Sequence, residues 1–322
     1  MMRVMFLLFL ALTVAPAGYA LEPLPEQPPI PQDNPMSAAK VALGRALYFD
    51  PRLSVDGTIS CNSCHNLMKG GDDSPSPVSE GVGGQLGARN SPTVWNAAFM
   101  SVLFWDGRAN SLEEQAQGPM TNPVEMGNPN VDAVVARLNQ IPLYRKAFQR
   151  VFGGGDALSA KHLTQAIAAF ERTLITPNSR FDLYLKGNKS ALSDEEMRGM
   201  QKFEGMGCAS CHSGPNFAGP LLPAGQGYYE KFPKVASSGY EKQYHLSDDL
   251  GRFNVTHKEE DKHMFRVPTL RNIARTAPYF HNGSVATLEE AVLVMGKTQL
   301  NKDLGPEDVK DLVAFLKTLT GH

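Results

Sequence analysis

Apolar residues recur every three or four positions in five segments of the chain, a spacing that places them on one face of an α-helix. These segments are 41–48, 163–174, 193–205, 287–295 and 306–319. Strict alternation of apolar and polar residues, which would indicate strands, is scarce. Long loops rich in Gly and Pro occupy residues 70–92 and 213–251. The pattern predicts a mainly α fold with long loops and little sheet.

Polar residues mark the start of two of these helices. Ser193 is followed three positions later by Glu196, which is the spacing of a capping box. Thr287 and Glu290 repeat this spacing near the end of the chain, and Gly296 follows the last apolar residue of that segment. We therefore expect helices to begin after Ser193 and after Thr287, and the second to end at Gly296.

The N-terminal residues resemble a cleaved signal peptide. A short basic start at Met1–Arg3 precedes an apolar run over 4–14 and a stretch rich in small residues over 15–20. A membrane anchor is the alternative, but the run is well short of the ~20 residues that a spanning helix needs. Cleavage after Ala20 would export the protein to a periplasm-like space. Residues 21–36 are rich in proline and predict an extended lead-in, with packed structure beginning near residue 37.

The composition is that of a folded globular protein. Hydrophobic residues make up 42% and charged residues 20% of the chain, and the residues after position 20 exceed one typical domain of ~100–150 residues. The turn at Thr176-Pro177-Asn178 divides them into predicted domains at 37–175 and 176–322. A net charge of −2 gives no indication of a nucleic-acid surface, and no later segment is apolar enough to span a membrane.

The motif Cys-x-x-Cys-His occurs twice and uses all four cysteines of the chain. Its residues are Cys61, Cys64 and His65 in the first copy and Cys208, Cys211 and His212 in the second. A redox dithiol, a local disulfide or half of a zinc site could explain a single Cys-x-x-Cys pair. The two pairs are 147 positions apart, far beyond the ~15–20 of a paired zinc motif. Both copies end in histidine, so we predict two covalently attached c-type haems, one per domain, with His65 and His212 as iron ligands.

The second axial ligand decides whether a haem carries electrons or binds a small molecule. No histidine lies between His65 and His162, and Met68 is too near His65 to reach the opposite face of the ring. An open distal face is therefore expected at the first haem. Candidate ligands for the second haem are Met264, Met295, His245, His257, His263 and His281. Met295 shares a helical face with apolar residues, so it is either a core residue or a thioether ligand that raises the haem potential.

Several blocks of sequence resemble the bacterial dihaem cytochrome c peroxidase family. They are CNSCHNLMKGG (61–71), RNSPTVWN (89–96), FWDGRA (104–109), QAQGP (115–119), VEM (124–126), VPTLRN (267–272) and APYFHNG (277–283). The resemblance covers nearly all of the chain after residue 20 and extends to related enzymes that mature tryptophan-derived cofactors. It implies that the first haem reduces hydrogen peroxide and that the second collects electrons from a small cytochrome c or cupredoxin. Members of the family often form homodimers.

The resemblance also implies roles for individual residues. Glu125 is similar to the distal acid of the family, which moves a proton between the two peroxide oxygens, and Gln115 is similar to a residue that orients peroxide. Trp105 matches the aromatic residue between the two haems. Met295 matches the second-haem ligand, a position at which the cofactor-maturing relatives carry tyrosine.

A calcium ion is a further implication of the resemblance. The family binds it near the haem interface through an asparagine side chain and two backbone carbonyls, which match Asn90, Thr276 and Pro278 here. Hard oxygen ligands suit Ca²⁺, and an ordinary turn asparagine is the alternative.

The chain departs from the family pattern in the loop after the first motif. Many members carry a histidine there that caps the first iron until the second haem is reduced, whereas this chain has Ser79-Glu80-Gly81. We expect a first haem that binds peroxide without reductive activation. Glu80 is either a weak ligand in the vacated space or a solvated loop residue. A non-catalytic electron carrier would need two closed haems, and a cofactor-maturing enzyme would lack Met295, so both alternatives fit less well than a peroxidase.

Overall fold

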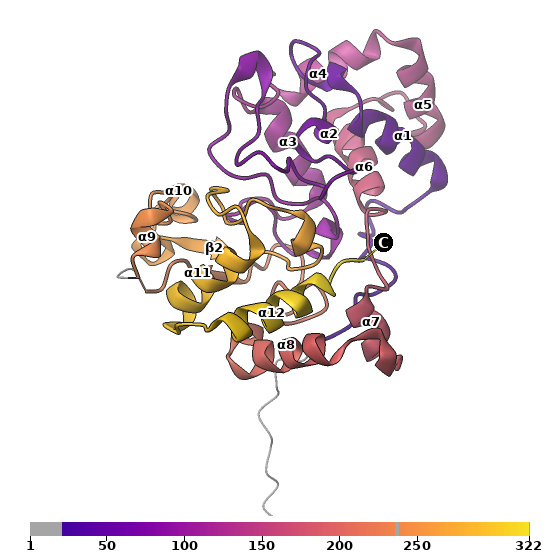
Figure 1. Ribbon diagram of the computed structural model, residues 1–322. Helices are drawn as coiled ribbons and strands as arrows, with labels where there is room; N and C mark the ends of the chain where they lie inside the picture. The colour runs from indigo at the N-terminus through magenta and orange to yellow at the C-terminus, as the bar shows by residue number, and fades with distance from the viewer. Residues whose placement is uncertain (1–20, 236–237, 322) are drawn as a thin grey trace, which may run out of the picture.

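The computed structural model describes residues 21–235 and 238–321, so the predicted signal peptide at 1–20 lies outside the described residues. Within them the chain is mainly helical and folds into two lobes (Figure 1), as predicted. The helices of the first lobe are α1 (Ala38–Tyr48), α2 (Cys61–Cys64), α3 (Leu112–Thr121), α4 (Val131–Asn139), α5 (Pro142–Phe152) and α6 (Ala160–Glu171). Those of the second are α7 (Arg180–Leu185), α8 (Asp194–Gly205), α9 (Tyr240–Gln243), α10 (Phe253–Thr256), α11 (Leu288–Leu300) and α12 (Pro306–Lys317).

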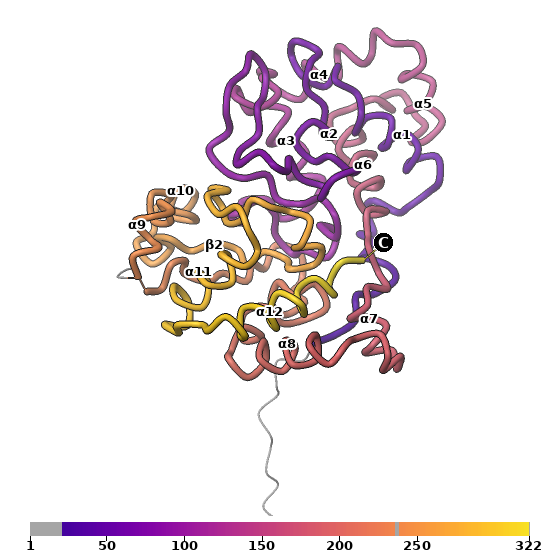
Figure 2. Tube along the Cα trace, viewed as in Figure 1, coloured from indigo at the N-terminus to yellow at the C-terminus, as the bar shows by residue number. Residues whose placement is uncertain are grey.

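The sheet consists of two short antiparallel strands, β1 (Tyr229–Lys231) and β2 (Met264–Arg266), with Tyr229 paired to Arg266. Long loops connect the helices, and the tube in Figure 2 shows how much of both lobes they form. No helix among the described residues is long and apolar enough to cross a membrane.

Local capping explains where the helices begin and end. The Ser193 hydroxyl accepts from the backbone N–H of Glu196 at the start of α8, and Thr287 accepts from Glu290 at the start of α11, as predicted. The predicted end of α11 at Gly296 is wrong, because the helix continues to Leu300. Asn301 adopts a left-handed conformation (φ 51°), and its N–H caps carbonyls of the last turn. That residue ends the helix as C-terminal asparagines commonly do.

The same close helix contact occurs once in each lobe. Gly44 of α1 lies against the carbonyl of Ala166 in α6, and Gly199 of α8 lies against the carbonyl of Asp311 in α12. A Cβ atom at either glycine would collide with that carbonyl, so only glycine permits this approach of the two backbones. The two lobes therefore share a helix-pair framework, with a Cys-x-x-Cys-His motif following the first helix of each pair.

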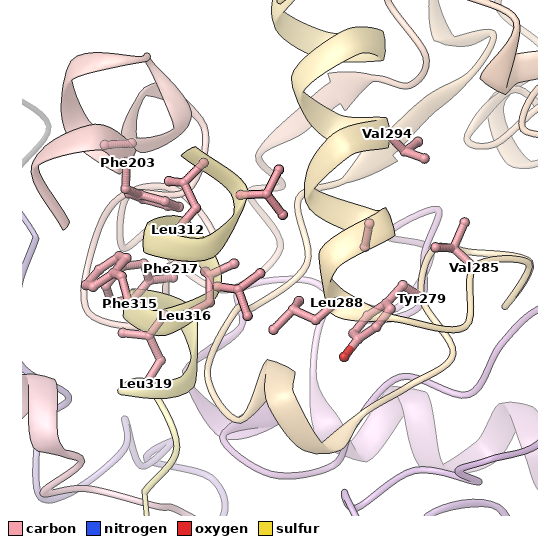
Figure 3. Close-up of a cluster of buried hydrophobic side chains, with 14 of the residues drawn as sticks. Phe203, Phe217, Tyr279, Val285, Leu288, Val294, Leu312, Phe315, Leu316 and Leu319 are labelled. Atoms are coloured by element: carbon pink, nitrogen blue, oxygen red, sulfur yellow. The ribbon is translucent and has the colours of Figure 1, made fainter. Parts of the chain in front are cut away.

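The buried apolar residues form separate clusters in the two lobes. In the first lobe, one large cluster draws its buried members from residues 43–167 and two smaller clusters from residues 48–174; the cluster of the second lobe draws its buried members from residues 181–319. Figure 3 shows part of the second-lobe cluster, where Phe203 of α8 and Phe315 of α12 lie close to Phe217. Their ring centroids lie 5.3–6.2 Å apart. The predicted boundary at 176–178 falls between the clusters of the two lobes.

The lead-in at 21–36 contains no helix or strand, as expected, but it is packed against both lobes. The backbone N–H of Leu24 donates to Asp182 Oδ1 (2.9 Å) in the second lobe. Asn34 Nδ2 donates to the Gln165 carbonyl (3.0 Å) in the first. Leu24 and Asn34 are each only 1% exposed. Packed structure thus begins earlier than the predicted residue 37, because this segment uses backbone and amide groups rather than a periodic apolar face to bind the lobes.

Candidate active site

A cavity of about 1030 Å³ lies between the lobes and is lined by residues of both. All of the predicted site residues line it. They are Cys61, Cys64, His65, Asn90, Trp105, Gln115, Glu125, Cys208, Cys211, His212, Thr276, Pro278 and Met295. Its wall is mostly apolar, which suits a large hydrophobic cofactor better than a polar metabolite.

The first motif occupies α2 and the residue that follows it. Nδ1 of His65 lies 3.0 Å from the carbonyl oxygen of Pro92. A carbonyl can only accept, so Nδ1 carries the proton and Nε2 keeps the lone pair that a metal would bind. Burial lowers the pKa of His65, which favours the neutral ring. The Tyr48 hydroxyl donates to the His65 carbonyl (2.7 Å) and helps to fix the residue.

The second motif repeats this arrangement. His212 Nδ1 lies 3.0 Å from the carbonyl of Phe217, and burial lowers the pKa of this ring as well. All four cysteines are free thiols. Burial raises the pKa of both Cys64 and Cys208 to about 11, which keeps these thiols protonated. Two free thiols and one correctly oriented imidazole at each end of an apolar cavity fit one haem apiece.

Glu125 lies in the turn after α3, in the first lobe. Asn122 Nδ2 donates to its Oε1 at 2.7 Å. Burial raises the pKa of Glu125, while Arg108 and the Asn122 hydrogen bond act in the opposite direction. Gln115 of α3 and Arg108 line the same cavity. A half-buried carboxyl of raised pKa, supported by an amide donor, is suited to accepting and returning a proton.

The loop that follows the first motif packs against the Glu125 segment. Val82 N donates to the Glu125 carbonyl at 2.9 Å. Gly81 lies so close to the Val124 carbonyl that a Cβ atom would collide with it. Glu80 is exposed and does not line the cavity. In this conformation the loop directs no ligand-forming side chain of residues 79–81 into the cavity except the hydroxyl of Ser79.

Trp105 is held by groups from both lobes. Its indole Nε1 donates to the Asn90 carbonyl (2.8 Å), and its own carbonyl accepts from the N–H of Arg266 (2.8 Å). Its ring centroid lies 6.3 Å from that of His281. Trp105 is thereby fixed between segments 89–96 and 264–281, where the lobes meet.

The other histidines and methionines separate into two groups. Met295 of α11 and the histidines His245 and His281 line the cavity, whereas His257, His263 and Met264 do not. His281 stacks on Phe265, with ring centroids 4.5 Å apart, and its Nε2 is buried without a hydrogen-bond partner among the described residues. Sequence reasoning alone did not separate these candidates.

The three residues expected to bind calcium all line the cavity. Asn90 is 9% exposed, and its Nδ2 donates to the Pro77 carbonyl at 3.0 Å, so the amide is fixed in orientation. Thr276 and Pro278 line the same cavity. Among the described residues there is no group of three or more His, Cys, Asp or Glu side chains placed to hold a metal ion.

Sequence reasoning missed several charged residues of the cavity wall. These are Arg89, Asp106, Arg108, Glu171, Asp249 and Arg266. Arg89 joins the lobes, since it donates to Asp106 (2.6 Å) in the first and to Asp249 (2.5 Å) in the second. Asp106 and Arg108 fall inside the FWDGRA block, so the block gave a signal for them. Glu171 gave none, because it occupies an ordinary position in a helical pattern.

The helical fold, the duplicated motif and the shared cavity define a dihaem protein. Residues 38–190 match the family model described as di-haem cytochrome c peroxidase. The chain is 46% identical to cytochrome c551 peroxidase of Nitrosomonas europaea, over 91% of this chain and 83% of that protein. It is 37% identical to the methylamine utilization protein MauG of Methylorubrum extorquens, over 92% of this chain and 82% of that protein.

Among solved structures, a MauG-like protein associated with microbial copper homeostasis superposes with a TM-score of 0.81. The identity is 32%, and the match covers 92% of this chain and 95% of that one. The chain belongs to the dihaem cytochrome c peroxidase family, and it is an enzyme of that class, with two haem groups and peroxide as its substrate.

Proposed function

We propose that the first haem is the site of peroxide reduction and that the second receives electrons from a small cytochrome c or cupredoxin. The overall reaction joins one hydrogen peroxide, two electrons and two protons to give two waters. When bound, each haem supplies an iron that exchanges single electrons. The observation that carries the assignment is the position of Glu125, which lies in the lobe of the first motif, acts electrostatically on Cys64 of that motif and accepts a hydrogen bond from Asn122.

In this proposal Glu125 takes the proton from one peroxide oxygen and returns it to the other. Gln115 donates a hydrogen bond that orients the peroxide, and both protons that the overall reaction consumes come from solvent. The apolar wall of the cavity strengthens both interactions because it excludes water. Trp105 provides an aromatic bridge across the interface for electrons that arrive at the second haem.

The covalent attachments follow from the duplicated motif. Cys61 and Cys64 would hold the first haem with His65 as ligand, and Cys208 and Cys211 the second with His212. Met295 is the proposed sixth ligand of the second haem, and it favours a peroxidase over a cofactor-maturing enzyme. We place calcium at Asn90, Thr276 and Pro278, and the protein in the periplasm after cleavage at residue 20.

Replacement of Glu125 by Gln tests the assignment of the acid–base group. We expect the variant to lose about 10²–10⁴-fold in kcat/KM for peroxide with a reduced donor, which is the usual contribution of a positioned proton-transfer group. Both haems should stay attached, as measured by absorbance per chain. Wild-type turnover in the fully loaded variant would show that Glu125 does not transfer the proton. The matched control is Glu80→Gln, because Glu80 is exposed and outside the cavity.

A further inference from the structure

Arg266 is a buried arginine whose contacts are all with neutral groups. It is 5% exposed and belongs to β2. Its Nε donates to the carbonyl of Phe104 (3.0 Å), and its Nη1 donates to the carbonyl of Val267 (3.2 Å) and to the sulfur of Met100 (3.8 Å). Among the residues that the structure describes, no carboxylate lies within salt-bridge distance of this guanidinium. The side chain lines the cavity.

The other buried arginine of this segment is paired, which shows what Arg266 lacks. Arg271 donates to Asp182 at 2.8 Å, and both side chains are fully buried. An unpaired buried charge costs several kcal/mol, so a folded protein normally supplies a counter-ion. For Arg266 the residues that the structure describes supply none, and the side chain lines the cavity.

The charged and titratable groups near Arg266 are already engaged. Asp106 binds Arg89 and Arg108. On β1, the Tyr229 hydroxyl accepts from Arg252, and Glu230 binds Lys234 at 2.6 Å. None of these groups is free to neutralise Arg266.

We propose that Arg266 binds a propionate carboxylate of one of the two haems and thereby helps to set the potential of that haem. The inference rests on the placement of the haems in this cavity under the proposed function. A haem carries two carboxylates on an otherwise apolar ring, and a guanidinium is the side chain best matched to a carboxylate. The side chain of Arg266 also donates to the Phe104 carbonyl, and its backbone N–H donates to the Trp105 carbonyl. The ion pair between Arg266 and the propionate would therefore hold one edge of the haem at the interface between the lobes.

The electrostatic consequence has a definite sign. A fixed positive charge near a haem stabilises the form with the extra electron, so it raises the midpoint potential. The same charge keeps the propionate ionised, so the midpoint potential changes little with pH near neutrality. Removal of the charge should lower the potential of the contacted haem and make it depend on pH, as the propionate then gains a proton when the iron is reduced.

Spectroelectrochemical titration of the fully loaded enzyme, at several pH values between about 5.5 and 8, tests the proposal without any peroxide. In Arg266→Gln we expect one of the two haems to show at least a tenfold fall in its reduced-to-oxidised ratio at a fixed applied potential. That change equals about 59 mV for a one-electron couple. The haem whose midpoint potential shifts is the one whose propionate Arg266 binds. Arg266→Lys should keep most of the wild-type potential and its weak pH dependence. Arg150→Gln, an exposed arginine on α5, is the control and should change neither haem.

Unchanged potentials and pH slopes for both haems in Arg266→Gln, with two haems per chain, would overturn the proposal. If Arg266→Gln fails to retain haem, Arg266→Lys decides the matter. A lysine variant that assembles with near wild-type potentials supports a role for the charge, whereas one that loses haem to the same extent would show that only the shape of arginine matters. Loss of peroxide turnover in Glu125→Gln does not affect these potentials, so the two proposals fail separately.

Discussion

Two carboxyl groups on the wall of one cavity, the half-buried Glu125 and the buried Glu171, differ in their neighbours. Glu125 accepts a hydrogen bond from Asn122, and Arg108 favours its charged form. Glu171 is buried at the end of α6, and its Oε2 has no partner among the described residues. Burial raises the pKa of Glu171 to about 8; the charge of Glu113 adds to this effect, and Arg172, which is paired with Glu113, opposes it. The first carboxyl is prepared to exchange a proton, and the second holds one at neutral pH.

Removal of the Asn122 amide should change the pH profile of peroxide reduction. The hydrogen bond stabilises the carboxylate of Glu125, so Asn122→Ala raises the pKa of that group further. A hydrogen bond to a charged group contributes about 1.5–3 kcal/mol, so we expect the acid limb of kcat/KM to move up by about one to two pH units. The measurement is kcat/KM across pH 4–9, and Asn188→Ala, outside the cavity, serves as control. An unmoved acid limb would mean that another group limits turnover at low pH.

Glu171 makes the stability of the protein depend on pH. Its pKa is near 4.5 in the unfolded chain and about 8 in the folded one, so its contribution is complete below 4.5 and is lost as the pH rises toward 8. Within this window the loss is about 1.4 kcal/mol per pH unit. Glu171→Gln should flatten the profile of urea midpoint against pH for the first lobe. A variant whose midpoints still fall as steeply as those of the wild type would show that other groups cause the dependence.

At the scale of the elements, each lobe depends on one glycine where two helices cross. The spacing of apolar residues in the sequence predicted the helices α1, α6, α8 and α12 that form these crossings. Ser193 and Thr287 predicted where α8 and α11 begin. The crossing itself was not predicted, because Gly199 and its neighbour Asp311 are far apart in sequence and the contact is between backbones. The true end of α11 was also missed, because Gly296 looks like a cap in sequence. In the structure Gly296 lies inside the helix, where it packs against Leu304, a residue that follows the helix.

Gly199→Ala should destabilise the second lobe selectively. The added methyl group collides with the Asp311 carbonyl, and overpacking of this kind costs about 1–3 kcal/mol. Gly205→Ala is a matched control in the same helix, because nothing lies within 4 Å of the added atom. The control should be neutral or more stable by up to about 1 kcal/mol. Thermal unfolding of the two variants, followed through the second haem, provides the comparison, and equal midpoints would contradict the steric explanation.

At the scale of the whole molecule, the two motifs lie in separate lobes but line one cavity. The sequence identified the predicted ligands and acid–base residues by motif, and the fold brings them together. Asp249 and Arg266 could not be found in this way, since neither lies in a matched block, a charged side chain has no periodic signal, and its function depends on a partner from the other lobe. The loop at 79–87 was noticed for a missing histidine, but its packing on Glu125 is visible only in three dimensions.

The packing of that loop predicts how the oxidation state affects peroxide binding. Because Val82 is hydrogen-bonded to Glu125 and residues 66–161 contain no histidine, we expect no ligand to block the first haem in the fully oxidised enzyme. Stopped-flow mixing should show peroxide reacting equally fast with oxidised and half-reduced enzyme. An oxidised form that reacts only after partial reduction, with a purely low-spin spectrum, would contradict this expectation.

The lead-in imposes an order in time on the assembly of the chain. Its first residues are synthesised early, yet Glu22 and Leu24 bind Arg271 and Asp182, which are made long afterwards. The N-terminal part of the lead-in can therefore bind the second lobe only when that lobe has folded. Until then the 172–180 connection alone joins the two lobes. Binding of the lead-in to the second lobe would be a late step in folding. In any chain whose second lobe is not folded, we expect a protease to cut the lead-in first.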